Sequence, residues 1–259
     1  GGCGTVEAAG PGTGAAARGS RVAAMVPHGG LAEAICLPAD ACARVPAGMS
    51  DAQAAGFIIA YATSLIALER AALAEGENLL VLGASGGIGL TAVEIGHRLG
   101  ARVIACARGA DKLAVARQAG ADDLVDSDTA DLRAEVRALG GADVIYDPVG
   151  GELFDQALRA TRQGARLLPL GFASGAVPQI PANLLLVKNL SVIGFYLGGY
   201  ARLHPSALPR ALDQLFGWYD QGLLAPHVSH VVPLQEANRA LDLLRTRAAT
   251  GKVVLSVGG

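Results

Sequence analysis

Several features that would place this sequence in a particular class of protein are scarce or missing. The 259 residues include only four cysteines and one tryptophan, and aromatic residues make up 4% of the chain. The cysteines, at positions 3, 36, 42 and 106, form no C-x-x-C pair and no recognisable loop spacing. We therefore expect buried, reduced thiols rather than a disulfide framework or a cysteine metal site.

An excess of charge of one sign is also missing. Lys plus Arg number 21 against 23 Asp plus Glu, and no basic cluster is interleaved with aromatics, which argues against nucleic-acid binding. No apolar run approaches the roughly 18 residues of a membrane span, and no signal-peptide pattern opens the chain. We expect a cytoplasmic protein that binds neither nucleic acid nor membranes.

The two ends of the chain differ in character from its middle. The sequence begins Gly1-Gly2-Cys3 without an initiator methionine, so we expect it to enter a larger fold part-way through. Short β-like pieces at 21–26 and 31–38 precede the middle; helix candidates at 206–221 and 235–247 and a terminal strand at 251–257 follow it. We expect residues 1–57 and 204–259 to form part of a mostly β domain, interrupted by a domain at 58–203.

The middle of the chain alternates short β-rich runs with helical patterns. The first helix, 87–99, repeats apolar residues at a spacing of three to four, so one stripe faces a sheet. This alternation predicts a doubly wound α/β domain with a six-stranded parallel sheet. The predicted strands are 79–83, 102–106, 123–125, 143–147, 166–170 and 190–194, and the other predicted helices are 110–119, 131–139 and 152–160.

The run "LLVLGASGGIG" joins the first strand to the first helix through a glycine-rich turn. Helix N-termini at such turns bind anions, usually a pyrophosphate. The spacing fits Gly83-x-x-Gly86-x-x-Gly89, or a dinucleotide fingerprint whose first glycine is replaced by Ala84. A tight turn without a ligand is the plain alternative. The predicted cofactor-binding residues here are Gly83, Ala84, Ser85, Gly86, Gly87 and Ile88.

The end of the second strand indicates which dinucleotide would bind. NAD binders place an acid there, about 20 residues after the glycines, to hold the ribose 2′-hydroxyl. Here Arg108 follows the strand and Lys112 lies one helical turn further on. Two cations suit the 2′-phosphate of NADPH, although both could be solvated cations of a helix start. Asp111 reads as a first-turn acid of that helix.

Two further loops follow strands of the predicted sheet, at the edge where such sheets bind ligands. They are Asp147-Pro148-Val149-Gly150-Gly151 and Gly171-Phe172-Ala173-Ser174-Gly175. Their glycines would let the backbone approach a nicotinamide ring closely, and ordinary turns would look similar.

The motifs together resemble the zinc-independent quinone-oxidoreductase branch of the medium-chain dehydrogenase/reductases, the zeta-crystallin-like enzymes. The resemblance rests on "GASGGIG" at 83–89, "YDPVGGELFD" at 146–155, "GFASG" at 171–175, "NLLLVKNLSVIGFY" at 183–196 and "ATGKVVL" at 249–255. It implies that the glycine loop, Arg108 and Lys112 bind NADPH. It also implies that the nicotinamide end is lined by Thr63, Asp147, Val149, Gly171, Phe172, Ala173, Ser174, Phe195 and Tyr196, with Lys252 beside the cofactor.

The chain departs from that family in three places. The upstream part of the β-rich domain is absent, the family's "GDRV" turn reads Gly19-Ser20-Arg21-Val22, and Ser127 stands where the family often has a tyrosine near the phosphate site. Zinc-dependent relatives place a cysteine where this chain has Ile59, and isoleucine cannot bind zinc. The pair His227 and His230 is more typical of a surface turn than of a metal site. We expect no metal.

The expected reaction is hydride transfer from NADPH to a quinone or an α,β-unsaturated carbonyl compound, with the protein supplying position and a closed site. Tyr61, Thr63 and Tyr196 are hydroxyl-bearing candidates for the catalytic site, and each could equally be a packed wall. Two alternatives stay open: a non-catalytic NADPH-binding protein and an enoyl-thioester reductase. The resemblance also implies a small-molecule substrate and a homodimer.

Overall fold

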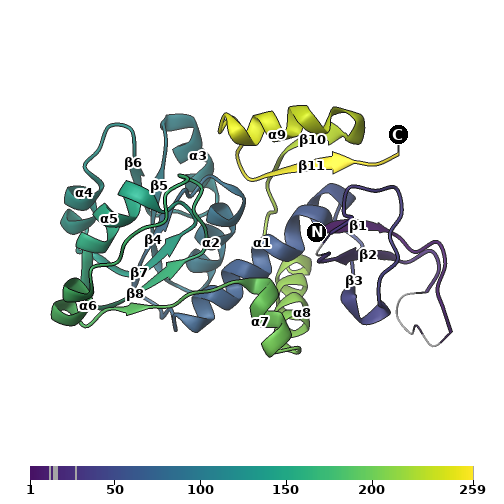
Figure 1. Cartoon of the computed structure of the whole chain (residues 1–259), viewed down its shortest axis with the longest axis horizontal. Coiled ribbons are helices and arrows are strands. Elements are labelled where there is room, and N and C mark those ends of the chain that lie inside the picture. Colours follow the sequence, from purple (N-terminus) through teal and green to yellow (C-terminus); the bar gives the residue numbers. More distant parts are fainter. Residues whose placement is uncertain (12, 14–16, 27, 259) are drawn as a thin grey trace. The chain divides into compact units, whose positions relative to one another are not determined.

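The computed structural model describes residues 1–11, 13, 17–26 and 28–258 (Figure 1). The chain divides into two compact units: residues 1–62 with 204–259, and residues 63–203. The division falls within helix α1 (Asp51–Arg70). Each unit is described by itself.

The second unit is built on a six-stranded sheet, all of whose pairings are parallel. The strands lie in the order β6-β5-β4-β7-β8-β9, so the direction of winding reverses between β4 and β7. The predicted doubly wound sheet is confirmed, and its switch point is where such sheets bind ligands. The strands are β4 (Asn78–Leu82), β5 (Arg102–Ala107), β6 (Asp123–Asp126), β7 (Ala142–Asp147), β8 (Thr161–Pro169) and β9 (Ser191–Val192).

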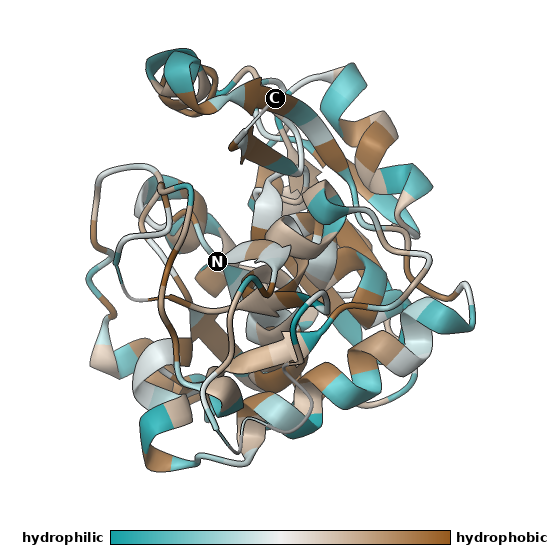
Figure 2. Ribbon diagram, turned by 90° about the vertical axis from the view of Figure 1, so that its right-hand side faces the viewer, coloured by the Kyte–Doolittle hydropathy of each residue, from teal (hydrophilic) through white to brown (hydrophobic). Residues whose placement is uncertain are grey.

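Five helices connect these strands: α2 (Gly87–Arg98), α3 (Ala110–Gln118), α4 (Leu132–Ala138), α5 (Gly151–Arg159) and α6 (Ala182–Lys188). The alternating sequence pattern predicted the first four; α6 and α7 (Leu197–Leu203), which follows β9, were not predicted. Figure 2 shows helices carrying both hydrophobic and hydrophilic residues, the pattern of helices with one face packed and the other exposed.

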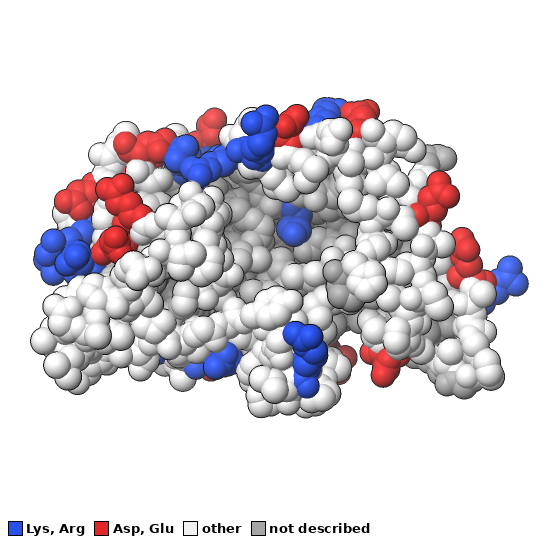
Figure 3. All heavy atoms as spheres, in the orientation of Figure 1, with Lys and Arg blue, Asp and Glu red and all other residues white. Residues whose placement is uncertain are grey.

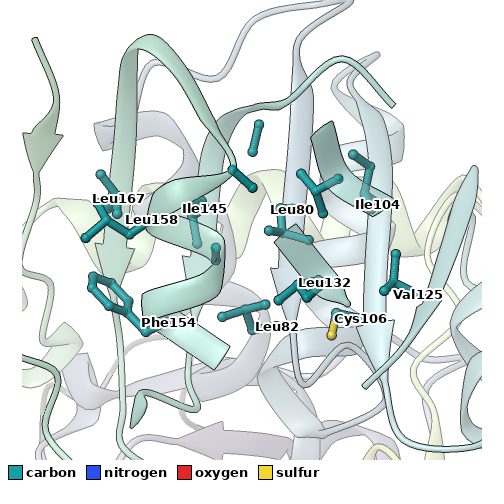
Figure 4. Close-up of a cluster of buried hydrophobic side chains, with 14 residues drawn as sticks. Leu80, Leu82, Ile104, Cys106, Val125, Leu132, Ile145, Phe154, Leu158 and Leu167 are labelled. Atoms are coloured by element: carbon teal, nitrogen blue, oxygen red, sulfur yellow. The ribbon is translucent and has the colours of Figure 1, made fainter. Parts of the chain in front are cut away.

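The core of this unit lies between one face of the sheet and helices α4 and α5. Leu80, Ile104, Ile145 and Leu167 project from neighbouring strands into one cluster, and Phe154 of α5 closes it (Figure 4). Phe154 is fully buried, and burying a side chain of this size contributes about 1.5–3 kcal/mol. Because the central strands are buried, the positions of the loops at the edge of the sheet are fixed by a tightly packed core.

The first unit combines two small sheets with helices. One sheet is antiparallel and the other parallel. Phe57 of α1 stacks on Phe216 of α8 at 5.4 Å between ring centroids. The elements are β1 (Gly2–Thr5), β2 (Arg21–Ala24), β3 (Cys42–Arg44), α8 (Ala207–Asp220), β10 (Val228–Pro233), α9 (Ala237–Arg245) and β11 (Lys252–Ser256), with 3₁₀ turns at Ala39–Ala41 and Leu234–Glu236.

Several sequence-based expectations for the first unit are wrong. Residues 31–38 form no strand. His230 lies in β10 rather than in a turn. All four cysteines are free thiols, but Cys106, in the second unit, is buried as expected, whereas Cys3 and Cys42 are half-buried and Cys36 is exposed. Helix α1 was not predicted. It is long and apolar enough to pass a test for a membrane span by length and composition, but 67% of the window that passes is buried inside the protein.

Candidate functional site

The glycine turn joins β4 to α2 at the switch point of the sheet. Gly83 has φ +61°, a conformation that favours glycine, and its carbonyl accepts a hydrogen bond from the Gly86 N–H at 2.9 Å. Gly86 is the N-cap of α2, and no side chain caps the helix there. The first N–H groups of α2 therefore point out of the turn as a site for an anion.

The glycines of the turn have different neighbours. A Cβ atom at Gly89 would lie 2.9 Å from Ala84 Cα and closer still to the Gly83 carbonyl oxygen. At Gly86 it would meet only that oxygen, at 3.3 Å. Gly89 thus serves the packing of helix against strand, whereas Gly86 is less crowded, with one close backbone contact. Both spacings of the motif share Gly86 and Gly89; they differ at the first position, where Gly83 has the positive φ and Ala84 is fully buried.

A buried network of hydroxyl groups joins α1, β7 and the first turn of α2, next to the glycine turn. Ser64 Oγ lies 2.8 Å from Tyr146 Oη and 2.7 Å from Thr91 Oγ1, and Thr91 Oγ1 donates to the carbonyl of Ile88 at 3.0 Å. Burial raises the pKa of Tyr146, so its hydroxyl stays protonated. The sequence directed attention to Thr63, which is half-buried, and gave no signal for its neighbour Ser64.

The end of β5 carries the predicted cation Arg108, and acids from β6 lie beside it. Arg108 Nε pairs with Asp128 Oδ1 at 2.9 Å, with the two side chains 53% and 48% exposed. Asp126 accepts hydrogen bonds from the Gly109 and Asp128 N–H groups, both at 3.0 Å. These bonds lower the pKa of Asp126.

The other predicted residues of this region lie close by in sequence. Ser127 N–H donates to the Ala107 carbonyl at 3.0 Å, which ties its loop to the end of β5. Lys112 lies half-buried in the first turn of α3. As expected, no acid lies at the end of β5, but Asp126 at the end of β6 and Asp128 two residues further on lie near Arg108, and no local sequence pattern predicted them.

Asp147 ends β7 and organises the loop that follows. Its buried carboxylate accepts hydrogen bonds from the Val149 N–H at 2.7 Å and the Gly150 N–H at 2.8 Å. Burial raises the pKa of Asp147, and the two N–H groups partly oppose that shift. The carboxylate is thus turned into the loop, so its contribution to a cofactor site is to fix the loop's shape.

The loops after β7 and β8 are joined by backbone hydrogen bonds. The Ala173 N–H donates to the Pro148 carbonyl at 3.1 Å, and the Ser174 N–H donates to the Val149 carbonyl at 2.9 Å. A Cβ at Gly83 would lie 2.9 Å from Val149 Cγ2, so the glycine turn contacts the first of these two loops, the one after β7. The structure therefore brings the three predicted glycine-rich segments together, with Gly171 half-buried and Phe172, Ala173 and Ser174 exposed.

The remaining predicted residues have varied surroundings. In the second unit, Phe195 is buried beneath the Arg70 guanidinium, whose Cζ lies 5.8 Å from the ring centroid, and Tyr196 is 72% exposed. In the first unit, Tyr61 is buried and stacks on Phe57 at 4.1 Å. Burial there lowers the pKa of Lys252. Phe195 and Tyr61 thus have packing roles, whatever else they do.

A metal ion in a protein is held by a group of His, Cys, Asp or Glu side chains. Within the ranges that the structure describes, no three His, Cys, Asp or Glu side chains are grouped so that they could hold an ion. His227 Nε2 lies 2.9 Å from Thr250 Oγ1, and His230 Nδ1 lies 2.9 Å from Ser229 Oγ. Both histidines of the H-x-x-H pair thus have hydroxyl neighbours.

Comparison with known proteins gives a consistent result. The sequence model of a family described as "Zinc-binding dehydrogenase" matches residues 87–216. A quinone oxidoreductase-like protein 2 homolog of Nematostella vectensis is 37% identical over 234 residues, which are 88% of this chain and 64% of that protein. Quinone oxidoreductase-like protein 2 of Bos taurus is 35% identical over 244 residues, 92% of this chain and 70% of that protein.

A solved structure extends the likeness to three dimensions. The quinone oxidoreductase of Thermus thermophilus, studied alone and in complex with NADPH, matches with a TM-score of 0.84 at 34% identity. The match covers 92% of this chain and 77% of that one. The chain spans about two thirds of the length of the curated relatives named above. The sequence motifs, the strand order and these similarities agree, and the chain belongs to the quinone oxidoreductase branch of the medium-chain dehydrogenase/reductase family.

Proposed function

We propose that this chain is part of an NADPH-dependent oxidoreductase. The enzyme transfers a hydride to a quinone or another conjugated carbonyl compound and needs no metal ion. The observation that carries the proposal is the N-terminus of α2, which follows the glycine turn at the switch point of the sheet and has no side-chain cap at Gly86. NADPH-bound relatives of the same fold support it. NADPH, when bound, supplies the hydride, and the protein supplies binding and orientation.

The residues described above would have separate tasks in this proposal. The N–H groups at the start of α2 would hold the pyrophosphate, and Arg108 and Lys112 would bind the 2′-phosphate. Asp147 fixes the loop that follows β7 through two backbone hydrogen bonds, and the loop after β8 is bonded to it. These two loops would line the nicotinamide end of the cofactor site and hold the nicotinamide ring in one orientation. Orientation of the reacting groups is a main contribution of a protein to hydride transfer.

A fluorescence titration with NADPH and NADH tests the binding step, and a turnover screen with quinones and enones tests the reaction. We expect NADPH to bind more tightly than NADH and at least one acceptor to be reduced. NADPH binding with no turnover of any acceptor would favour the alternative of a non-catalytic NADPH-binding protein. Failure of both cofactors to bind would refute the proposal.

The turn itself offers a variant for the same titration. In Gly86→Val a branched side chain would occupy the space that the pyrophosphate needs, so we expect loss of cofactor binding from a folded protein. A variant that unfolds would show instead that Gly86 is needed for packing. Circular dichroism distinguishes the two results.

A further inference from the structure

The acids beside Arg108 change the charge balance of the expected 2′-phosphate site. Arg108 and Lys112 bring two positive charges to the region, and Asp126, which ends β6, and Asp128, two residues beyond it, bring two negative ones. Acidic and basic side chains also lie next to one another elsewhere on the face of the molecule drawn in Figure 3. A phosphate monoester carries about −1.5 to −2 charge at neutral pH. An anion arriving there would therefore meet carboxylates as well as cations.

The two acids are held differently. Asp126 is committed to the backbone, because its Oδ1 accepts from both the Gly109 and Asp128 N–H groups. Asp128 pairs with Arg108 through its carboxylate, and both side chains are about half exposed. An exposed pair of this kind is weak and can exchange partners.

We propose that Asp128 is a specificity-determining residue that competes with the cofactor's 2′-phosphate for the Arg108 guanidinium. The inference rests on the proposed function. The competition concerns Nε of Arg108, one of the donors that a bidentate phosphate contact uses. NADH carries only a neutral 2′-hydroxyl, which neither needs Arg108 nor is repelled by Asp128. Asp128 thus makes the ratio of NADPH affinity to NADH affinity smaller than Arg108 and Lys112 alone would make it.

Binding constants of a small set of variants test this inference. The set is the unmutated chain, Asp128→Asn, Asp128→Glu, Arg108→Ala and the double variant Arg108→Ala with Asp128→Asn. Asp155→Asn, an exposed acid of α5 in the same unit, is the matched control for the loss of one negative charge. Nicotinamide fluorescence gives the Kd for NADPH and NADH, and thermal unfolding confirms that each variant is folded.

We expect Asp128→Asn to tighten NADPH binding about two- to fivefold, the range of an exposed ion pair, and to leave NADH binding unchanged. The gain should shrink at high salt, disappear in the Arg108→Ala background, and be absent from Asp128→Glu and Asp155→Asn. A residue with a merely structural role would change both cofactors alike.

Three results would overturn the inference. Weaker NADPH binding by Asp128→Asn would show that Asp128 orients Arg108 for the phosphate. An equal gain without Arg108 would show a general charge effect, and no change would show that the pair does not compete. In each case tight NADPH binding by the unmutated chain would leave the proposed function standing, whereas binding of neither cofactor would refute both.

Discussion

Replacing Gly89 with alanine tests whether this glycine is required for packing. The new Cβ would lie 2.9 Å from both Ala84 Cα and the Gly83 carbonyl carbon. Relieving these contacts with the backbone needs α2 to move away from the turn by about half an ångström or more, because carbon atoms pack at about 3.5–4.0 Å. Overpacking of this kind typically costs about 1–3 kcal/mol.

Alanine also has a higher helix propensity than glycine, by up to about 1 kcal/mol. The expected net loss for Gly89→Ala is therefore about 1–2 kcal/mol in the free energy of unfolding, measured by urea denaturation. Because the N-terminus of α2 moves, we also expect weaker binding of both NADPH and NADH, by the same factor.

Gly86→Ala is the matched control in the same turn. Its Cβ would meet only the Gly83 oxygen at 3.3 Å, and alanine at an N-cap costs at most about 1 kcal/mol relative to glycine. We expect a smaller loss of stability than for Gly89→Ala. A Gly89→Ala chain as stable as the unmutated one, or a Gly86→Ala chain less stable than the Gly89→Ala chain, would refute the inference that Gly89, rather than Gly86, is required for packing.

Three further predictions address charge and metal. Replacing Arg108 and Lys112 together with alanine should cost on the order of 1–3 kcal/mol of NADPH affinity and leave NADH affinity nearly unchanged; equal affinity of the unmutated chain for the two cofactors would contradict it. Burial raises the pKa of Asp147 in the folded chain above its ordinary value of 3.8. Between these two pKa values the folded state binds more protons than the unfolded state, so the free energy of unfolding falls as the pH rises through this range. Urea unfolding at several pH values should show that the free energy of unfolding of the unmutated chain, relative to that of Asp147→Asn, increases as the pH falls from the folded pKa of Asp147 toward about 3.8. If the two chains show the same dependence of stability on pH, the raised pKa of Asp147 is refuted. Chelator treatment should leave NADPH-linked quinone reduction unchanged, and activity lost to chelator and restored by zinc would overturn the metal-free proposal.

The sheet could be predicted from the sequence because each of its central strands is a short apolar run that ends in turn residues. Helix α1 escaped prediction for the opposite reason. Apolar residues surround much of its circumference, and buried positions such as Phe57, Ile58, Ala60 and Leu65 leave no single stripe to detect. The strand predicted at 31–38 is wrong because a β-like sequence forms a strand only where another strand can pair with it.

The turn and loops of the site were predictable because a change from strand to glycine to helix is a local signal. The contacts around them were not. Ser64 meets Tyr146 only through the packing of α1 against β7, and Arg108 meets Asp128 only because β5 and β6 pair with Ala107 opposite Asp126. Pairs so distant in the chain depend on register and packing, which no local pattern specifies.

The hydrogen bonds between the loops after β7 and β8 have a consequence for engineering and evolution. Because Ala173 and Ser174 donate to the carbonyls of Pro148 and Val149, a backbone change in either loop alters the partner's hydrogen bonding. Substitutions that change the backbone conformation of one segment, such as replacement of Pro148 or of a positive-φ glycine, should therefore be coupled to substitutions in the other. Where a change of loop conformation is wanted, the unit to transfer is both loops together.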